Sequence, residues 1–195
     1  FNLKDSTGRT VLFDAVDGGN IDILRDVINN INNINILDEN HQNALFSAVL
    51  KDDISIANEL ILHGINVNFL DKDGQNVLFN AILQGVKNLP IIDLLFKKGI
   101  NLNIVDNYHK NIIDELLYVF DLQKNQPKEA LEYYVKAAEA NKNEFTTPRY
   151  LLKAGKTALA LGQKADALKY FTEIKDNYDN TPEAQSVDGL IGLAQ

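Results

Sequence analysis

The sequence of 195 residues contains no cysteine, no methionine and no tryptophan, and its longest apolar runs are only a few residues long. The absence of cysteine excludes disulfides, thiolate nucleophiles and cysteine-ligated metals. Apolar runs this short fall far below the roughly 20 residues that a membrane-spanning helix needs. Since the sequence begins at Phe1 and lacks methionine, we expect the start of the gene product to be missing. A cytoplasmic location is favoured, and a periplasmic or secreted location stays open.

Negative charge is confined to the first part of the chain. Residues 1–122 contain 9 Lys or Arg and 17 Asp or Glu, a net charge of −8, whereas residues 123–195 contain 10 of each kind. Residue usage changes at the same place, because Asn falls from 19 to 5, Ile falls from 17 to 2 and Ala rises from 5 to 11. The sequence therefore predicts two domains, residues 1–122 and 123–195. The acidic first domain disfavours nucleic acid as a partner and favours a basic protein.

A repeat of 33 residues runs through the first part. Asp5, Asp38 and Asp71 begin three copies, and Asp106 begins a weaker fourth copy. Gly or His follows three residues after each Asp, and Thr or Asn follows five residues after it. Leu-Phe-x-Ala begins seven residues after the Asp in the first three copies. Self-similarity at this period is typical of stacked helical units.

Each copy predicts a tight turn followed by two helices. The polar residues expected to cap these helices share a side-chain oxygen that accepts from free backbone N–H groups. They are Thr10, Asn43, Asn76 and Asn111 for the first helices and Asn20, Asp53 and Asn88 for the second helices. Gly64 and Gly99 suit a left-handed helix end. The apolar residues, Phe46 and Phe79 among them, are expected to be buried between units because one unit cannot bury its own apolar face.

This pattern resembles the ankyrin repeat over roughly residues 1–120. The match rests on Asp-x-x-Gly-x-Thr-x-Leu and on "GINVN" and "GINLN", which are similar to that family's Gly-Ala-x-Val-Asn ending. The family's Thr-Pro-Leu-His reads Thr10-Val11-Leu12-Phe13 here, so phenylalanine is expected to replace the histidine with apolar stacking. The resemblance implies about three and a half repeats, truncated at the N-terminus.

The second part resembles the tetratricopeptide repeat over roughly residues 125–182. The segments "KEALEYYVKAAEANKN" and "ADALKYFTEIKDNYDN" align, and Thr147 capping with Pro148 in the first turn predicts a helix between them. Gly155 and Ala167 are expected where paired helices approach closely, with Phe171 as the large residue between them. The expected fold is all-α, an α-solenoid of ankyrin repeats continued by tetratricopeptide-like helical hairpins.

The resemblance to ankyrin proteins places partner binding at the turn tips and on the exposed side of the first helices. The positions at turn tips are Arg9, Asn40, Gln42, Lys72 and Gln75. The positions on the helices are Asp14, Asp17, Ser47, Leu50, Asn80 and Leu83. The tetratricopeptide resemblance adds Arg149 and Lys156 on the first helix of its hairpin. Variation between copies at the ankyrin positions suits a binding face and a free surface equally.

The residues contain no pattern that indicates catalysis, a metal or a cofactor. No glycine-rich phosphate loop or His-Glu-x-x-His occurs, and adjacent carboxylates such as Asp52-Asp53 point apart on a helix. The resemblance therefore implies a non-enzymatic protein-binding scaffold. A narrower alternative is a bacterial immunity or inhibitor protein that neutralises a basic toxin. A different alternative is an engineered or chimeric fusion whose second part is a purely structural cap.

Overall fold

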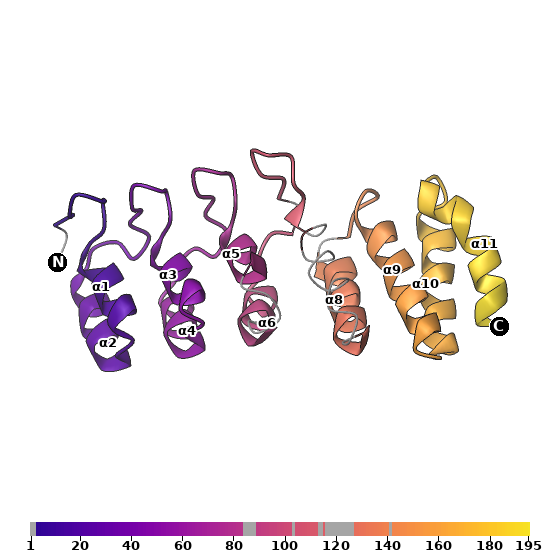
Figure 1. The fold of residues 1–195 in the computed structure, drawn as a ribbon, viewed down its shortest axis with the longest axis horizontal. Coiled ribbons are helices and arrows are strands. Elements are labelled where there is room, and N and C mark those ends of the chain that lie inside the picture. Colours follow the sequence, from indigo (N-terminus) through magenta and orange to yellow (C-terminus); the bar gives the residue numbers. More distant parts are fainter. Residues whose placement is uncertain (1–2, 84–88, 103, 113–114, 116–126, 141) are drawn as a thin grey trace. The chain divides into compact units, whose positions relative to one another are not determined.

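The computed structural model describes residues 3–83, 89–102, 104–112, 115, 127–140 and 142–195 (Figure 1). Every regular element within these ranges is a helix, and Val105 and Asn111 form an isolated antiparallel bridge. The predicted all-α fold is therefore confirmed. The chain divides into two compact units, Phe1–Leu116 (unit 1) and Leu117–Gln195 (unit 2). The domain boundary predicted near Leu122 lies outside the described residues.

Unit 1 is a stack of helix pairs with its turns projecting from one edge (Figure 1). The first helices of the pairs pack on one another in one row, and the second helices form another row. The first helices are α1 (Val11–Gly18), α3 (Ala44–Leu50) and α5 (Val77–Leu83). The second helices are α2 (Ile21–Asn30), α4 (Ile54–Leu62) and α6 (Leu89–Lys97). This arrangement is an α-solenoid.

The Leu-Phe-x-Ala residues form the core of unit 1. Phe46 is 4% exposed and Phe79 is 2% exposed, which confirms their predicted burial. The leucines of the same motif are fully buried. Because α1, α3 and α5 pack in one row, the repeated motif brings equivalent apolar side chains together in the interior.

The Asp that begins each repeat organises its turn. Its Oδ1 accepts hydrogen bonds from the backbone N–H groups two and four residues later in all four copies, over distances of 2.8–3.0 Å. The residue three positions after the Asp has a positive φ, which glycine adopts in two copies. His41 and His109 take the same conformation, with φ of 59° and 62°.

Backbone hydrogen bonds join each turn to the next. The N–H of Glu39 donates to Thr7 O over 2.8 Å, and the N–H of Lys72 donates to Asn40 O over 3.0 Å. The N–H of Asn107 donates to Asp73 O over 2.8 Å. The three bonds link equivalent positions of successive repeats, so the turns form a continuous row.

Asparagines join the hinge segments that follow the second helices, and the sequence did not predict this. The N–H of Asn66 donates to Asn35 Oδ1, and the N–H of Asn101 donates to Asn68 Oδ1, both over 2.7 Å. Asn68 Nδ2 also donates to Gly99 O over 3.2 Å, so the Asn68 amide binds the next hinge both as an acceptor and as a donor. We call this set the asparagine ladder. It gives a structural use to part of the high asparagine content of residues 1–122.

The predicted helix caps are confirmed at four positions. Asn43 Oδ1 accepts from Leu45 N–H over 3.2 Å, and Asn76 Oδ1 accepts from Leu78 N–H over 3.1 Å. The caps of the second helices that are confirmed are Asn20, bound by Asp22 and Ile23 N–H, and Asp53, bound by Ile56 N–H. The predicted cap at Asn88, and the helix expected after Asn111, fall in stretches that include residues outside the described ranges.

The predicted side-chain cap at Thr10 is wrong. Asn43 and Asn76 use both ends of their amides, because each Nδ2 also donates over 2.8 Å to a hinge carbonyl, that of Asn66 or Asn101. Thr10 is 2% exposed, makes no cap bond, and leaves its Oγ1 buried without a hydrogen-bond partner. A threonine hydroxyl is shorter than an asparagine amide and offers one polar atom instead of two, so it cannot reproduce this bridge.

We expect Thr10→Asn to stabilise unit 1 by about 1–2 kcal/mol. The new amide would cap the Leu12 N–H and reach the Asn33 carbonyl, as Asn43 does one repeat later, and it would remove a buried unsatisfied hydroxyl. Urea unfolding followed by circular dichroism measures the change. The control is Asn43→Thr, for which a loss of similar size is expected. A Thr10→Asn protein no more stable than the parent would contradict this account.

The described residues of unit 2 form four successive helices, α8 (Pro127–Ala140), α9 (Thr147–Ala160), α10 (Lys164–Asn177) and α11 (Pro182–Ala194). Each helix packs on the next, and α11 also contacts α9. The first residue of α9 is Thr147 and its cap position is Thr146, so the predicted cap at Thr147 is wrong by one residue. Thr147 instead uses its Oγ1 to accept from the Asn143 N–H over 2.9 Å, because it already lies in the first turn.

Gly155 on α9 packs tightly against Phe171 on α10. Phe171 is fully buried, and a Cβ atom placed on Gly155 would lie 2.7 Å from its Cζ. Ala167 is also fully buried. The predicted arrangement of small residues around a large aromatic one is therefore confirmed, because only a glycine at position 155 leaves room for the ring.

Candidate protein-binding surface

Two rows of equivalent positions run along the first helices of unit 1. The first row is Asp14, Ser47 and Asn80, and the second row is Asp17, Leu50 and Leu83. Asp14 is exposed, and the other two residues of its row are half-buried. Leu50 is 60% exposed, although α3 buries most of its other apolar residues. Leu83 belongs to α5, but its side chain lies outside the described residues. We call these rows the first-helix face.

Asp17 is held by two cations. The Arg9 guanidinium pairs with Asp17 Oδ2, and Lys51 Nζ lies 3.7 Å from Asp17 Oδ1. Lys51 Nζ also donates to the Asp17 carbonyl over 2.8 Å, which ties α1 to the next repeat. The Arg9 guanidinium lies 5.1 Å from the centre of the Phe13 ring, a favourable cation–π distance. The charge of Asp17 is therefore largely balanced, whereas the carboxylate of Asp14 stays exposed.

The glutamines at the turn tips bind the next repeat. Gln42 Nε2 donates to Asp71 Oδ2 over 3.2 Å, and Gln75 Nε2 donates to Asp106 Oδ2 over 2.7 Å. These amides therefore serve in stacking the turns, and only part of each side chain faces solvent. Of the other predicted tip residues, Asn40 and Lys72 are exposed and Arg9 is half-buried.

Asp106 shows how strongly these bonds hold the ionised carboxylate. Burial raises its pKa, but the N–H groups of Lys110 and Tyr108 and the amide of Gln75 all donate to it. The balance holds the pKa of Asp106 below its ordinary value of 3.8. The turn around Asp106 is thus built around a carboxylate that is ionised at neutral pH.

An ion pair between α2 and α4 was missed by the sequence analysis. Arg25 Nε donates to Glu59 Oε1 over 2.8 Å, and Arg25 Nη2 donates to Glu59 Oε2 over 3.1 Å. Glu59 is 7% exposed, and the hydrogen bond from Arg25 lowers its pKa below the ordinary value of 4.5. His63 Nδ1 approaches the same carboxylate within 3.7 Å. The available signal was the pair of opposite charges on two successive second helices.

Arg149 and Lys156 are both exposed on α9 in unit 2. Their separation of two helical turns places them on one face of that helix. Arg149 Nε lies 3.5 Å from Glu183 Oε1 of α11, so part of its charge is balanced within the unit. The two residues remain a predicted binding pair.

Residues 12–106 match the family model of ankyrin repeats in three copies. This segment is made of ankyrin repeats. The match begins at Leu12 and ends at Asp106, so it spans the helix pairs of unit 1. No curated protein matches the chain. Ankyrin repeats are generic protein–protein interaction modules and are typically non-enzymatic.

The described residues hold no group of three or more His, Asp or Glu side chains that could bind a metal ion. Within the same residues, no helix combines the length and apolar character needed to cross a membrane.

Proposed function

We propose that unit 1 binds a basic protein through the first-helix face and the turn tips. The observation that carries this proposal is that an apolar side chain and an acidic side chain are both exposed on the first helices of unit 1. Leu50 offers an apolar anchor at 60% exposure, and Asp14 adds an unshielded carboxylate on the same row of helices. Interfaces commonly combine an apolar centre with a charged rim. The net charge of −8 on residues 1–122 would attract a basic partner from a distance.

The finer assignments belong to the same proposal. An immunity or inhibitor protein acting on a basic toxin is its narrower form, supported by the same negative charge. We also propose that residues 123–195 form tetratricopeptide-like hairpins, supported by the packing of Gly155 on Phe171. A separate alternative is an engineered or chimeric fusion in which residues 123–195 are a purely structural cap, and the change in residue usage between the two parts supports it.

Site-specific photo-crosslinking tests where the partner binds. A crosslinking amino acid is placed at position 14 or 47 on the first-helix face, and at the exposed position Asp26 on α2 as the control. We expect crosslinks to the partner from positions 14 and 47 and none from position 26. Crosslinks from position 26 alone, or from Lys156 on α9, would contradict the proposed face.

With the partner in hand, we expect Asp14→Asn to slow association by up to about fivefold, because one exposed charge pair is worth roughly 0.2–1 kcal/mol. The difference should fade as salt screens the charges. Asp26→Asn changes the net charge equally and is expected to have a smaller effect, because it lies on a second helix. The double variant Asp14→Asn, Asp17→Asn should slow association further than Asp14→Asn alone. A parent association rate that does not depend on salt would refute the basic-partner proposal.

A further inference from the structure

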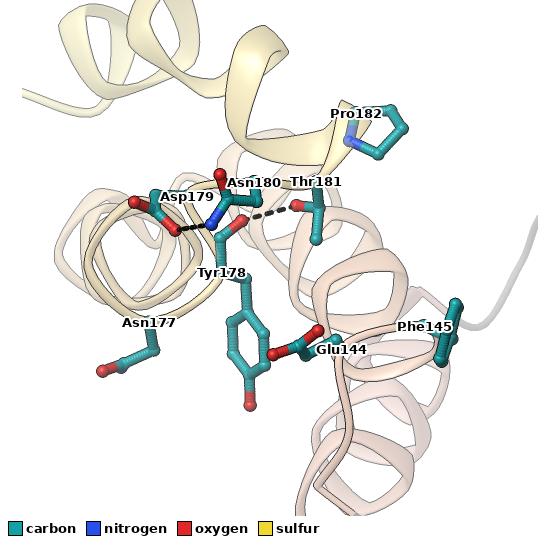
Figure 2. Close-up of a pocket in the computed structure, with 8 residues that line it drawn as sticks. All are labelled: Glu144, Phe145, Asn177, Tyr178, Asp179, Asn180, Thr181 and Pro182. Atoms are coloured by element: carbon teal, nitrogen blue, oxygen red, sulfur yellow. Dashed lines mark hydrogen bonds between the residues drawn. The ribbon is translucent and has the colours of Figure 1, made fainter.

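A hollow of about 200 Å³ lies in unit 2, where the α8–α9 loop meets the α10–α11 loop (Figure 2). Two aromatic residues line it, Phe145 from the first loop and Tyr178 from the second. Two carboxylates line it as well, those of Glu144 and Asp179. The hollow is smaller than the roughly 300–1,000 Å³ of sites for drug-sized ligands. It suits a single side chain or a small ion.

Both aromatic residues are presented by turns that are closed by hydrogen bonds. Asn143 Oδ1 accepts from the N–H groups of Phe145 and Thr146, over 2.9 and 2.8 Å. The carbonyl of Tyr178 accepts from Thr181 N–H over 3.1 Å and from Thr181 Oγ1 over 2.7 Å. A site built on ordered turns loses little conformational entropy when it binds a ligand.

Phe145 is unusual because it is an aromatic residue that is 81% exposed. In Figure 2 its side chain lies at the edge of the group, apart from Tyr178 and Glu144. The ring of Tyr178 and the carboxylate of Glu144 overlap in the view of Figure 2, and both residues line the hollow. An aromatic face adjoining carboxylates attracts cations, because the ring face and the carboxylates are both negative.

The charges around the hollow favour a cation. Its lining residues, as far as the structure describes them, include no Lys, Arg or His. Two neighbouring lysines are engaged elsewhere, since Lys142 Nζ lies 3.4 Å from Glu173 Oε1 and Lys175 pairs with Asp188. The C-terminal end of α10, at Asn177, also borders the hollow and carries the negative end of that helix dipole.

The N-terminus of α11 borders the same hollow and would by itself favour an anion. Thr181, however, already caps that helix, with its Oγ1 accepting from Ala184 N–H over 3.3 Å. The carboxylates of Glu144 and Asp179 would repel an anion as well. More of the groups that line the hollow therefore favour a cation than favour an anion.

We propose that this hollow binds an arginine side chain of a partner protein. The planar guanidinium stacks on an aromatic face and donates to carboxylates with its remaining N–H groups. Tyr178 supplies an aromatic face and Glu144 supplies the acceptor near it. Phe145 and Asp179 flank them on opposite sides (Figure 2), and Asp179 Oδ1 also accepts from Asn180 Nδ2 over 2.9 Å. The site lies in unit 2 and is independent of the first-helix face, so either proposal can fail without the other.

An amide NMR titration of the full chain with argininamide tests this site. We expect saturable shifts at Phe145 and at residues 178–181, with a dissociation constant on the order of 1 mM for so small a ligand. Citrullinamide has the same shape without the charge, and we expect it to bind at least about tenfold more weakly. Equal binding of citrullinamide, saturation by inorganic phosphate at the same residues, or no saturable shift would overturn the proposal.

Three substitutions locate the ligand among the lining groups. Phe145→Ala, Glu144→Gln and Asp179→Asn change side chains on the exposed rim, so the parent spectrum should persist elsewhere in the unit. Each is expected to weaken argininamide binding by about three- to tenfold. The control is Asp166→Asn on α10, which removes one negative charge from an exposed position outside the hollow. Unchanged binding by the three rim variants, or an equal loss with Asp166→Asn, would refute the site.

Discussion

Replacing Phe79 by alanine is expected to destabilise unit 1 by about 3–5 kcal/mol, the usual loss for truncating a buried aromatic residue. Phe79 is 2% exposed and lies on α5, which packs against α3 on one side and against α6 within its own repeat. The cavity would thus open between neighbours that are themselves tied by the turns and the asparagine ladder. Such neighbours relax only partly, so most of the transfer and cavity cost is retained.

Urea unfolding monitored by circular dichroism measures this loss. The control is Asn80→Ala, the next residue on α5, which is half-buried and expected to change stability by less than about 0.5 kcal/mol. Because stability in a repeat array is a sum over units and their interfaces, the weakened repeat should also broaden the transition of unit 1. A Phe79→Ala protein that melts within about a degree of the parent would show that the ring does not carry the core.

Replacing Gly155 by alanine is expected to destabilise unit 2 by roughly 1–3 kcal/mol, although alanine is the better helix former. The added Cβ would lie 2.7 Å from Cζ of Phe171, closer than carbon atoms approach. Phe171 is fully buried, so its ring cannot move into solvent to make room. The helices α9 and α10 must therefore separate, or the ring must leave its preferred rotamer.

Two glycines of α11 provide matched controls for Gly155→Ala. A Cβ on Gly189 or Gly192 would meet no atom within 4 Å, so only the helix propensity changes. Each of these alanine variants is expected to stabilise unit 2 by about 0.5–1 kcal/mol. Adding Phe171→Leu to Gly155→Ala should recover part of the loss, which a double-mutant cycle measures. A Gly155→Ala protein as stable as the Gly189→Ala protein would mean that the ring does not pack as described.

The sequence predicts the features of this fold that repeat. The spacing of Leu-Phe-x-Ala predicts the helix pairs and the burial of Phe46 and Phe79, because a periodic apolar pattern has few other solutions. The caps at Asn20, Asn43, Asp53 and Asn76 follow from local chemistry at helix starts. The prediction at Thr10 fails because the caps at Asn43 and Asn76 are also bridges to the hinge of the same repeat, and a threonine hydroxyl cannot make both bonds.

Contacts between repeats account for what the sequence did not predict. Arg25 and Glu59 are 34 residues apart, and their pairing depends on how far α4 is rotated against α2. The asparagine ladder depends in the same way on the register between hinges. On the candidate binding face, the sequence marks Asp14 and Asp17 alike. Only the three-dimensional arrangement shows that Arg9 and Lys51 balance one of the two charges.

The bonds between turns and between hinges fix the spacing of successive repeats in unit 1. Asp71 accepts from Gln42 and Asp106 accepts from Gln75, so the third repeat carries both a donor for its successor and an acceptor for its predecessor. A duplicated whole repeat would find every one of these partners in place. A one-residue insertion would misalign the donors with the acceptors at both neighbouring junctions. Such a chain can therefore lengthen or shorten by whole repeats far more readily than by single residues. Asp106 lies 35 residues after Asp71, two more than the period of 33, so the third repeat must accommodate two extra residues between its bonding positions.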